Sequence, residues 1–214
     1  MKKAIVLGGS RGIGKAIADS LKTIDCDVIA TSKKELDTSN LDSVKKFAQD
    51  KETDILVLNT GGPPAKEFSS VTVEEWQKYH NQLFLGFCVL LQNIKVQNGG
   101  YIFLISSSVI KEPNPRLVIS SAYRLAFSSV FKLLSKEFAA RDVSCINIAP
   151  GLIDTDRMRE VIANAEDMKK TIPMKRFGKP KEIGDFVKAI VENNIKYLSG
   201  VVINFDGASS NYTL

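Results

Sequence analysis

The stretch GGSRGIG at 8–14 constrains this chain more than any other part of its sequence. It follows the short apolar run AIVLG at 4–8 and precedes KAIADSLKTI at 15–24, whose apolar residues recur at helical spacing. Glycines in a strand–turn–helix context let the chain bend sharply and bring bare backbone N–H groups to an anion at the helix N-terminus. We therefore expect the turn to bind the pyrophosphate of a dinucleotide. The turn residues expected at this cofactor are Gly8, Ser10, Arg11, Gly12, Ile13 and Gly14.

Apolar strand-like runs alternate with helix-like stretches along the whole chain. The runs are continuously apolar, which is typical of strands buried on both faces of a parallel sheet. This alternation predicts right-handed crossovers and a doubly wound α/β sheet with helices on both faces, in a single domain over 1–214. Strands are expected at 4–8, 27–31, 54–59, 101–106, 143–149 and 201–205. Helices are expected at 15–24, 41–50, 71–95, 118–140 and 180–194, the third opened by a capping box of Thr72 and Glu75.

The segment after the second expected strand bears on the choice of dinucleotide. An acidic residue at the end of that strand would bind a ribose 2′-OH, but the sequence there is TSKK at 31–34. Ser32 and Lys33, together with Arg11 in the glycine turn, suit a 2′-phosphate and favour NADP(H). Asp37 follows closely, so NAD(H) stays open, as does the alternative that the lysines belong to a solvated loop.

Composition limits the other classes of function. A chain of 214 residues with net charge +5 and no dense basic tract is not expected to bind nucleic acid. Its three cysteines lie far apart and no Cys/His cluster occurs, so we expect neither disulfides nor a metal site. The longest apolar run, at 83–91, is too short to span a bilayer, and only four apolar residues follow the opening MKK before glycines begin. We therefore expect a cytoplasmic protein without a signal peptide and without a membrane partner.

Four further motifs occur with the glycine turn in one characteristic order. They are NTGG at 59–62, ISS at 105–107, APG at 149–151 and FGKPKEIG at 177–184. As a set they resemble the short-chain dehydrogenase/reductase family over nearly the whole chain. The resemblance implies a single Rossmann-type domain, a nicotinamide cofactor laid across the strand ends, and a homodimer or homotetramer assembled through the helices at 71–95 and 118–140.

The resemblance also places cofactor contacts outside the glycine turn. On the adenosine side, an asparagine and two glycines after the third strand line the cofactor and brace the sheet, and an aspartate approaches the adenine amine. The other contacts pack against the nicotinamide or follow in the loop that touches the pyrophosphate. The residues concerned are Asp37, Asn59, Gly61 and Gly62 on the first side, and Pro150, Gly151, Ile153 and Thr155 on the second.

The catalytic residues are where this sequence departs from the family. Members normally use an Asn, a Ser and a Tyr-x-x-x-Lys pair. Ser107 matches the family serine, whereas ungapped counting puts Ser120 at the tyrosine position and Arg124 at the lysine position. The asparagine position falls on Leu83. Ser107, Ser120 and Arg124 are therefore the candidate catalytic residues.

Two alternatives stay open for this stretch. Tyr123 would be the family tyrosine only in a shifted register, which would require a lysine at the position of Phe127, because helical spacing puts such a pair four residues apart. A purely structural alternative makes Ser120 a small residue near a helix start and pairs Arg124 with a nearby carboxylate.

Three functional hypotheses follow from the altered pair. The first is an NADP(H)-dependent oxidoreductase acting on a carbonyl or hydroxyl group, in which the two serines bind the carbonyl oxygen and Arg124 stabilises negative charge. The second is an NADP(H)-binding protein with lost or reduced catalysis that serves as a sensor or partner subunit. The third is another reaction on the same scaffold. A ketoacyl-reductase-like branch of the family has a similar pattern of GGPP, here at 61–64, with Ser and Arg in place of Tyr and Lys. The polar, helix-prone loop at 154–174 favours a small polar substrate, whose identity the sequence leaves open.

Overall fold

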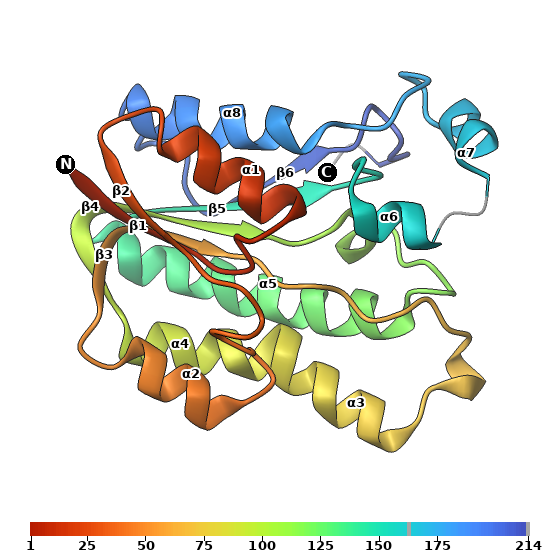
Figure 1. Ribbon diagram of the computed structural model, residues 1–214, viewed down its shortest axis with the longest axis horizontal. Helices are drawn as coiled ribbons and strands as arrows, with labels where there is room; N and C mark the ends of the chain where they lie inside the picture. The colour runs from red at the N-terminus through yellow and green to blue at the C-terminus, as the bar shows by residue number, and fades with distance from the viewer. Residues whose placement is uncertain (162–163, 213–214) are drawn as a thin grey trace.

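A six-stranded parallel sheet lies between two layers of helices in the computed structural model, which describes residues 1–161 and 164–212 (Figure 1). The strand order is β2-β1-β3-β4-β5-β6. All five pairings are parallel, so each connection crosses over a face of the sheet. The single-domain, doubly wound α/β fold expected from the sequence is confirmed. The strands are β1 (Lys2–Val6), β2 (Cys26–Ala30), β3 (Glu52–Leu58), β4 (Lys95–Ile105), β5 (Ser144–Pro150) and β6 (Val201–Phe205).

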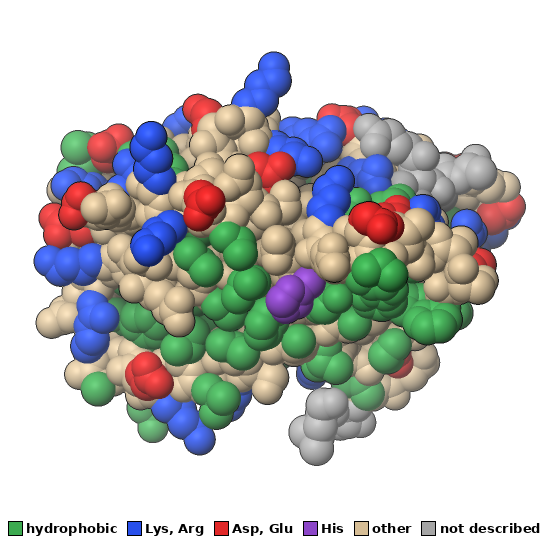
Figure 2. Space-filling view, turned by 90° about the horizontal axis from the view of Figure 1, so that it is seen from below, with side chains coloured by type: hydrophobic (Ala, Val, Ile, Leu, Met, Phe, Trp, Pro, Cys, Tyr) green, Lys and Arg blue, Asp and Glu red, His purple; other side chains and the backbone are tan. Residues whose placement is uncertain are grey.

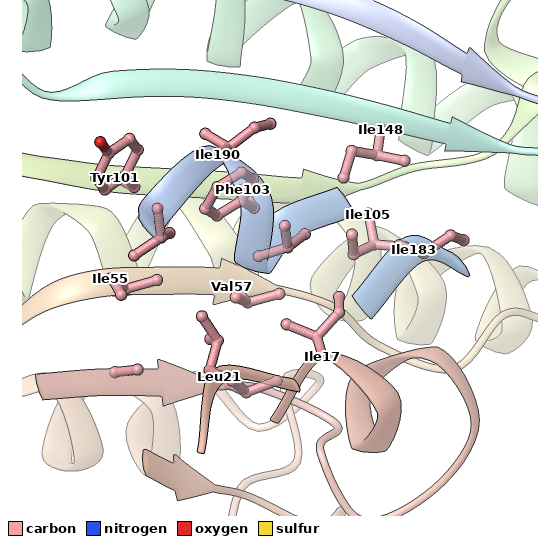
Figure 3. Packing of buried hydrophobic residues seen from close by; sticks show 14 of the residues in the cluster. Ile17, Leu21, Ile55, Val57, Tyr101, Phe103, Ile105, Ile148, Ile183 and Ile190 are labelled. Carbon is pink, nitrogen blue, oxygen red and sulfur yellow. The ribbon is translucent and has the colours of Figure 1, made fainter. Parts of the chain in front are cut away.

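Helices α1 (Gly12–Leu21) and α8 (Pro180–Glu192) cover one face of the sheet. Their apolar faces bury Ile17 and Leu21 from α1 together with Ile183 from α8 against the central strands. Figure 3 shows these side chains lying over isoleucine, valine and aromatic residues of β3 and β4. Complete burial of each such side chain contributes about 1.5–3 kcal/mol, so this layer fixes α1 firmly behind the glycine turn that precedes it.

The opposite face carries α2 (Leu41–Ala48), α4 (Gly86–Asn93) and α5 (Val118–Ala139). Phe87 and Leu90 of α4 and Phe127 of α5 are almost fully buried there. The remaining elements are α3 (Val73–His80), the π-helical turn η2 (Asn81–Leu85), α6 (Asp156–Val161), α7 (Ala165–Thr171), and the short 3₁₀ turns η1 (Phe68–Ser70) and η3 (Ser108–Ile110). Figure 1 shows α6 and α7 beyond the end of the sheet toward which the strands point.

The helix predicted at 71–95 differs locally from expectation. Its capping box is present, because Thr72 accepts from the Glu75 backbone N–H and the Glu75 carboxylate accepts from that of Thr72. The helix is then interrupted by η2, where the Gln82 carbonyl accepts a hydrogen bond from the Thr38 hydroxyl at 3.1 Å. It ends at Asn93, and β4 begins two residues later. The wider π turn frees carbonyls that an α-helix would use internally, so a loop from elsewhere binds here.

The loop at 154–174, which the sequence predicted to be polar and helix-prone, contains the two short helices α6 and α7. Asn164 caps α7 by accepting from the Asp167 backbone N–H, and acidic residues occupy the first turn while lysines occupy the last. These local signals stabilise a helix too short to show an apolar periodicity. Within the described residues, no helix has the length and apolarity needed to cross a membrane.

Candidate active site

The glycine turn between β1 and α1 has the conformation that an anion-binding loop requires. Gly8 and Gly12 have φ values of +57° and +56°, in the left-handed region that favours glycine. The Asn59 amide holds the turn from the end of β3, donating to the carbonyl oxygens of Leu7 at 3.1 Å and Gly8 at 3.2 Å. No described side chain caps the N-terminus of α1, so its first backbone N–H groups face outward. The turn can therefore cradle a phosphate, and it fits a dinucleotide.

A cavity of about 530 Å³ opens along this turn. It brings together most residues that the sequence assigned to the cofactor, namely Gly8, Ser10, Arg11, Gly12, Ile13, Lys33, Asp37, Asn59, Gly61, Gly62 and Thr155. Gly14 lies behind the wall, where it lets α1 approach the turn. Other lining residues were not found from the sequence, chiefly Thr38, Thr60, Lys78, Tyr79, Gln82 and Arg157. Thr60 lies within the NTGG motif but was not singled out there. The others come from segments without a recognisable motif, and only the fold brings them to this cavity.

The loop after β2 carries three residues predicted to contact the cofactor, Ser32, Lys33 and Asp37, of which Lys33 and Asp37 line the cavity. Ser32 is absent from the cavity wall, since its backbone N–H donates to Glu35 at 2.6 Å and its hydroxyl accepts from the Glu35 N–H at 3.4 Å. Lys33 lines the cavity and forms an ion pair with Asp37 at 3.4 Å. Partial burial would raise the pKa of Asp37, but hydrogen bonds from Ser39 and the charge of Lys33 outweigh it and lower the pKa. Arg11 is exposed, and no ion pair of Arg11 occurs within the described residues.

A second cavity of about 290 Å³ continues from the first. Its walls include all three candidate catalytic residues, Ser107, Ser120 and Arg124, and the four predicted nicotinamide-side residues Pro150, Gly151, Ile153 and Thr155. The two cavities share a wall formed by Ile13, Asn59, Thr60, Gly62, Thr155 and Arg157. They are therefore two ends of one cleft at the carboxyl ends of the strands, the place where open α/β sheets bind ligands.

Ser120 and Arg124 lie one helical turn apart on α5 and meet on the cavity wall. The Arg124 guanidinium donates from Nε to the Ser120 hydroxyl at 3.2 Å, and from Nη1 to the carbonyl oxygens of Ile105 at 3.1 Å and Ser106 at 3.3 Å. Nη2 donates to the Thr60 carbonyl at 3.3 Å. No carboxylate pairs with Arg124 in the part of the chain that the structure describes. The structural alternative, in which Arg124 pairs with a nearby carboxylate, is therefore wrong. Burial lowers the pKa of Arg124 to about 10, which leaves it charged at neutral pH.

Both candidate serine hydroxyls are arranged as donors toward the cavity. The Ser120 oxygen accepts from Arg124, and the Ser107 oxygen accepts from the Val109 backbone N–H at 3.4 Å. Within the described residues neither hydroxyl donates to another protein group, so each keeps its proton for a ligand. A charged donor behind Ser120 makes its O–H a stronger donor in turn. The pair can therefore bind a ligand oxygen, most strongly one that carries negative charge.

A closed ring of hydrogen bonds among four residues fixes the position of Arg124. Its side chain donates to the Ser106 carbonyl, and the Ser106 hydroxyl donates to Asn147 Oδ1 at 2.5 Å. The Asn147 amide donates to the Ser128 hydroxyl at 3.1 Å, which donates to the Arg124 carbonyl at 2.7 Å. Ser106 directly follows β4, and the other residues come from β5 and α5, so the ring holds the serine-bearing strand end and the helix in one position. No sequence motif predicted it.

Tyr123 points away from the cleft. Its ring packs 5.7 Å from that of Trp76 and 5.4 Å from that of His80, both on α3, and it is not part of either cavity wall. Burial raises the pKa of its hydroxyl, the opposite of what a proton donor near neutral pH needs. The shifted-register interpretation is therefore wrong. Leu83, at the family's asparagine position, is 1% exposed and belongs to the core.

Comparisons with known proteins agree with this geometry. Residues 35–209 match the family model described as Enoyl-(Acyl carrier protein) reductase. Among curated proteins, the 3-oxoacyl-[acyl-carrier-protein] reductase FabG of Aquifex aeolicus is 29% identical, covering 96% of each chain, and that of Escherichia coli is 27% identical over the same shares. A short chain dehydrogenase of Burkholderia cenocepacia, solved in complex with NADP, superposes with a TM-score of 0.88 at 23% identity over 97% of both chains. A dehydrogenase/reductase of Sinorhizobium meliloti gives 0.88 at 23% identity over 98% of this chain and 95% of that one.

Proposed function

This chain belongs to the short-chain dehydrogenase/reductase family of oxidoreductases, and from that premise we propose that it transfers a hydride between NADP(H) and a carbonyl or hydroxyl group of a small molecule. Ser107, Ser120 and Arg124 form the altered site at which the reacting oxygen is held. The nicotinamide, when bound, supplies or accepts the hydride. The protein's own groups bind the oxygen, orient it and stabilise the charge that develops on it.

The observation that carries this proposal is the half-buried Arg124 guanidinium, which has no carboxylate partner among the described residues and lies on the wall of the catalytic cavity. A charge that is partly removed from water and lacks a counter-ion is costly. A ligand oxygen that becomes negative during the reaction offsets that cost, and it does so more as its charge grows. Such an interaction is stronger in the transition state than with the neutral carbonyl, which is the requirement for catalysis.

The proton balance follows from the residues present. As the hydride adds to the carbonyl carbon, the carbonyl oxygen gains negative charge and accepts hydrogen bonds from Ser107 and Ser120. Neither serine is acidic enough to give up its proton, and Arg124 stays charged, so water entering the cleft supplies the proton that completes the alcohol. Each oriented donor to an oxyanion contributes about 10²–10³-fold in rate. We therefore expect turnover slower than that of a site with an acidic tyrosine.

Positive charge in the larger cavity supports NADP(H) over NAD(H). Arg11, Lys33, Lys78 and Arg157 line it, against Asp37 and Asp156. Lys33 is partly neutralised by Asp37, so Arg11 is the cation best placed for a 2′-phosphate. The Burkholderia cenocepacia structure was solved with NADP, which agrees with this choice without deciding it.

A second candidate is a protein that binds NADP(H) and no longer catalyses. The observation in its favour is that four hydrogen bonds from Arg124 already go to protein oxygens. No aspartate, glutamate, histidine, cysteine, tyrosine or lysine lines the catalytic cavity among the described residues. A site of this kind could hold the cofactor rigidly and serve as a sensor or partner subunit.

Self-association is part of the proposal. Figure 2 shows a band of hydrophobic side chains, with the single histidine among them, on the side of the molecule that carries α2, α3 and α4. Phe84, Cys88 and Val89 are half-buried on that side, and Leu125 and Leu133 of α5 are exposed. Apolar surface of this extent favours a homodimer or homotetramer through α3–α4 and α5. The cytoplasmic location and the extent of the domain over 1–214 stay predictions.

The proposed reaction is tested by titrating the protein with NADPH and NADH, and then measuring NADPH consumption against a panel of small ketones and aldehydes. We expect tighter binding of NADPH and slow, substrate-dependent consumption. Ser120→Ala should lower kcat by about 10²–10³-fold while NADPH affinity changes little, because this hydroxyl contacts the reacting oxygen. Ser120→Tyr combined with Arg124→Lys should raise the rate.

Ser121→Ala is the matched control for this experiment. Ser121 is also buried on α5, but its hydroxyl donates to the Leu117 carbonyl at 3.0 Å and lies outside both cavity walls. Its replacement should leave kcat unchanged. NADPH binding without turnover on any member of the panel would favour the non-catalytic candidate, and equal turnover by wild type and Ser120→Ala would contradict the assigned role of Ser120.

A further inference from the structure

The loop that follows β3 lies between two polar side chains from different helical segments. Arg124 of α5 donates from Nη2 to the Thr60 carbonyl oxygen at 3.3 Å. Gln82 of the π-helical turn η2 donates from Nε2 to the Gly61 carbonyl oxygen at 2.7 Å and to the Thr60 hydroxyl at 3.3 Å. Thr60 borders both cavities, whereas Gln82 lines the larger one. Arg124 and Gln82 therefore hold the same short loop, one from the catalytic side and one from the cofactor side.

A cycle of three hydrogen bonds fixes the orientation of the Gln82 side chain. The Thr38 hydroxyl donates to the Gln82 backbone carbonyl at 3.1 Å, so its oxygen accepts from the Thr60 hydroxyl at 3.2 Å. The Thr60 oxygen in turn accepts from Gln82 Nε2, which closes the cycle. Because the Gly61 carbonyl can only accept, reversing the amide would bring two oxygens face to face. Both amide hydrogens of Gln82 are therefore engaged by the protein.

The amide oxygen of Gln82, by contrast, has no donor among the described residues. Gln82 is only 8% exposed, and it lines the cavity assigned to the dinucleotide. A nearly buried amide oxygen without a donor is costly, and a donor on a bound ligand removes that cost. Asp37 lines the same cavity, but its carboxylate already accepts from Ser39 and pairs with Lys33. Gln82 therefore offers this cavity an acceptor that the protein itself leaves unused.

From these contacts we propose that Gln82 binds the dinucleotide and positions Arg124 at the same time. Its Oε1 atom accepts a hydrogen bond from an amine or hydroxyl of the adenosine half, and its Nε2 atom fixes the loop whose carbonyl accepts from Arg124. This inference rests on the proposed function. For the hydride transfer Gln82 is a positioning residue, because it acts on the reacting oxygen only through Thr60 and Arg124. The two roles belong to different atoms, so substitutions can separate them.

Two substitutions of similar size test these roles. Gln82→Met removes the acceptor and the donors together, so it should raise the Kd of NADPH by about 3–10-fold and lower kcat at saturating NADPH by about 10-fold. Gln82→Glu keeps the size of the side chain, but its ionised form cannot donate to Gly61. Protonation restores a donor, so the kcat of this variant, relative to wild type at the same pH, should recover as the pH falls from 8 to 5.

Two further measurements complete the test without depending on turnover. Deamino-NADPH identifies the ligand donor, because a weaker affinity than that of NADPH in wild type, absent from Gln82→Met, assigns the adenine amine, and equal affinities in wild type assign a ribose hydroxyl. In the NADP⁺-loaded protein, the Arg124 Nε–H proton should exchange with water faster in Gln82→Met than in wild type, as measured by NMR, because the loop beside the guanidinium is released. Thermal denaturation verifies that each variant is folded at the assay temperature.

Gln49→Glu is the matched control, because Gln49 is exposed just after α2 and lies outside both cavity walls. This variant should leave NADPH affinity, kcat and Arg124 exchange as in wild type. An unchanged Kd or an unchanged Arg124 exchange rate in Gln82→Met would overturn the inference, as would a pH-independent loss of kcat in Gln82→Glu. Wild-type protein without turnover, in which Gln82→Met still alters Kd and exchange, would overturn the proposed reaction and retain the role of Gln82.

Discussion

Gly14 lies in the first turn of α1, and its α-carbon faces the turn that precedes the helix. A β-carbon at this position would lie 2.2 Å from the Gly8 carbonyl oxygen and 2.7 Å from the Asn59 amide nitrogen. Both neighbours are fixed, since Asn59 holds the Gly8 carbonyl by a hydrogen bond. The close approach of helix to turn therefore depends on a single missing methyl group, and it sets the position of every N–H that faces the cleft.

Gly14→Ala should weaken both folding and cofactor binding. Overpacking against fixed backbone costs about 1–3 kcal/mol, so the Tm should fall by several degrees and NADPH affinity should fall with it. Gly61→Ala is the stability control, because a β-carbon there meets no atom within 4 Å. The two variants are compared by thermal denaturation, and Gly14→Ala is compared with wild type by NADPH titration. An alanine at 14 that leaves both quantities unchanged would contradict the close packing described here.

The candidate catalytic residues show how far sequence reasoning extends at this scale. Ungapped counting placed Ser120 and Arg124 on one helical face, and the structure puts them together on the wall of the cleft. Counting could not identify the carbonyl oxygens that Arg124 contacts, because those belong to strand ends brought near it only by the sheet order. Arg157 was missed for the same reason, since its neighbours in sequence give no sign of which cavity it lines.

At the scale of elements, the strands and long helices were predictable because each carries a continuous apolar run or a helical periodicity. The interruption of the long helix at Asn81–Leu85 could not be predicted. It depends on the hydrogen bond from the Thr38 hydroxyl to Gln82 and on the close approach of Gly86 to the Thr38 carbonyl. That contact joins segments more than forty residues apart. The helical tendency of 154–174 was predicted, but the bounds of α6 and α7 were not, because polar capping residues, and not buried side chains, define a helix such as α7.

The start of α8 gives a prediction for an element. Two hydrogen bonds from Arg176, at 2.9 Å and 2.7 Å, and one from the Lys179 backbone N–H lower the pKa of Glu182 to about 2, below its ordinary 4.5. A carboxyl whose pKa is lowered on folding stabilises the protein above its ordinary pKa and loses that contribution as the pH falls toward 2. The pair is partly exposed, so the contribution is at most about 1 kcal/mol.

Glu182→Gln should therefore be less stable than wild type at pH 7, and the difference should shrink as the pH is lowered below about 4.5 toward the pKa near 2. Denaturant unfolding of both proteins across the acidic range in which they stay folded measures it. Glu166→Gln, in the exposed ion pair of α7, is the matched charge control. A difference between Glu182→Gln and wild type that stays constant with pH would contradict the assignment.

At the scale of the whole molecule, one side carries a band of hydrophobic side chains among charged and polar ones (Figure 2). The exposed fractions of Leu125 and Leu133 are 49% and 62%, and both project from the outer side of α5. A monomer rarely leaves so much apolar surface in water beside half-buried neighbours on α4. This is the feature of the complete fold that supports self-association.

Leu133→Asp should shift the protein from dimer or tetramer toward monomer, because a carboxylate buried in an apolar interface lacks a partner. Sedimentation velocity over a range of concentrations measures the change. Tyr197→Asp is the control, since Tyr197 is fully exposed on the loop before β6, outside the helices of the proposed interface, and should leave the association state as in wild type. A wild-type protein that sediments as a monomer at every concentration would contradict the proposed assembly.

The wall shared by the two cavities has a kinetic consequence. Asn59, Thr60, Gly62 and Thr155 each border both compartments, so a dinucleotide that settles against them also finishes the enclosure in which the smaller reactant must sit. For the proposed reaction we therefore expect a compulsory order of addition, in which the dinucleotide enters first and its converted form departs last.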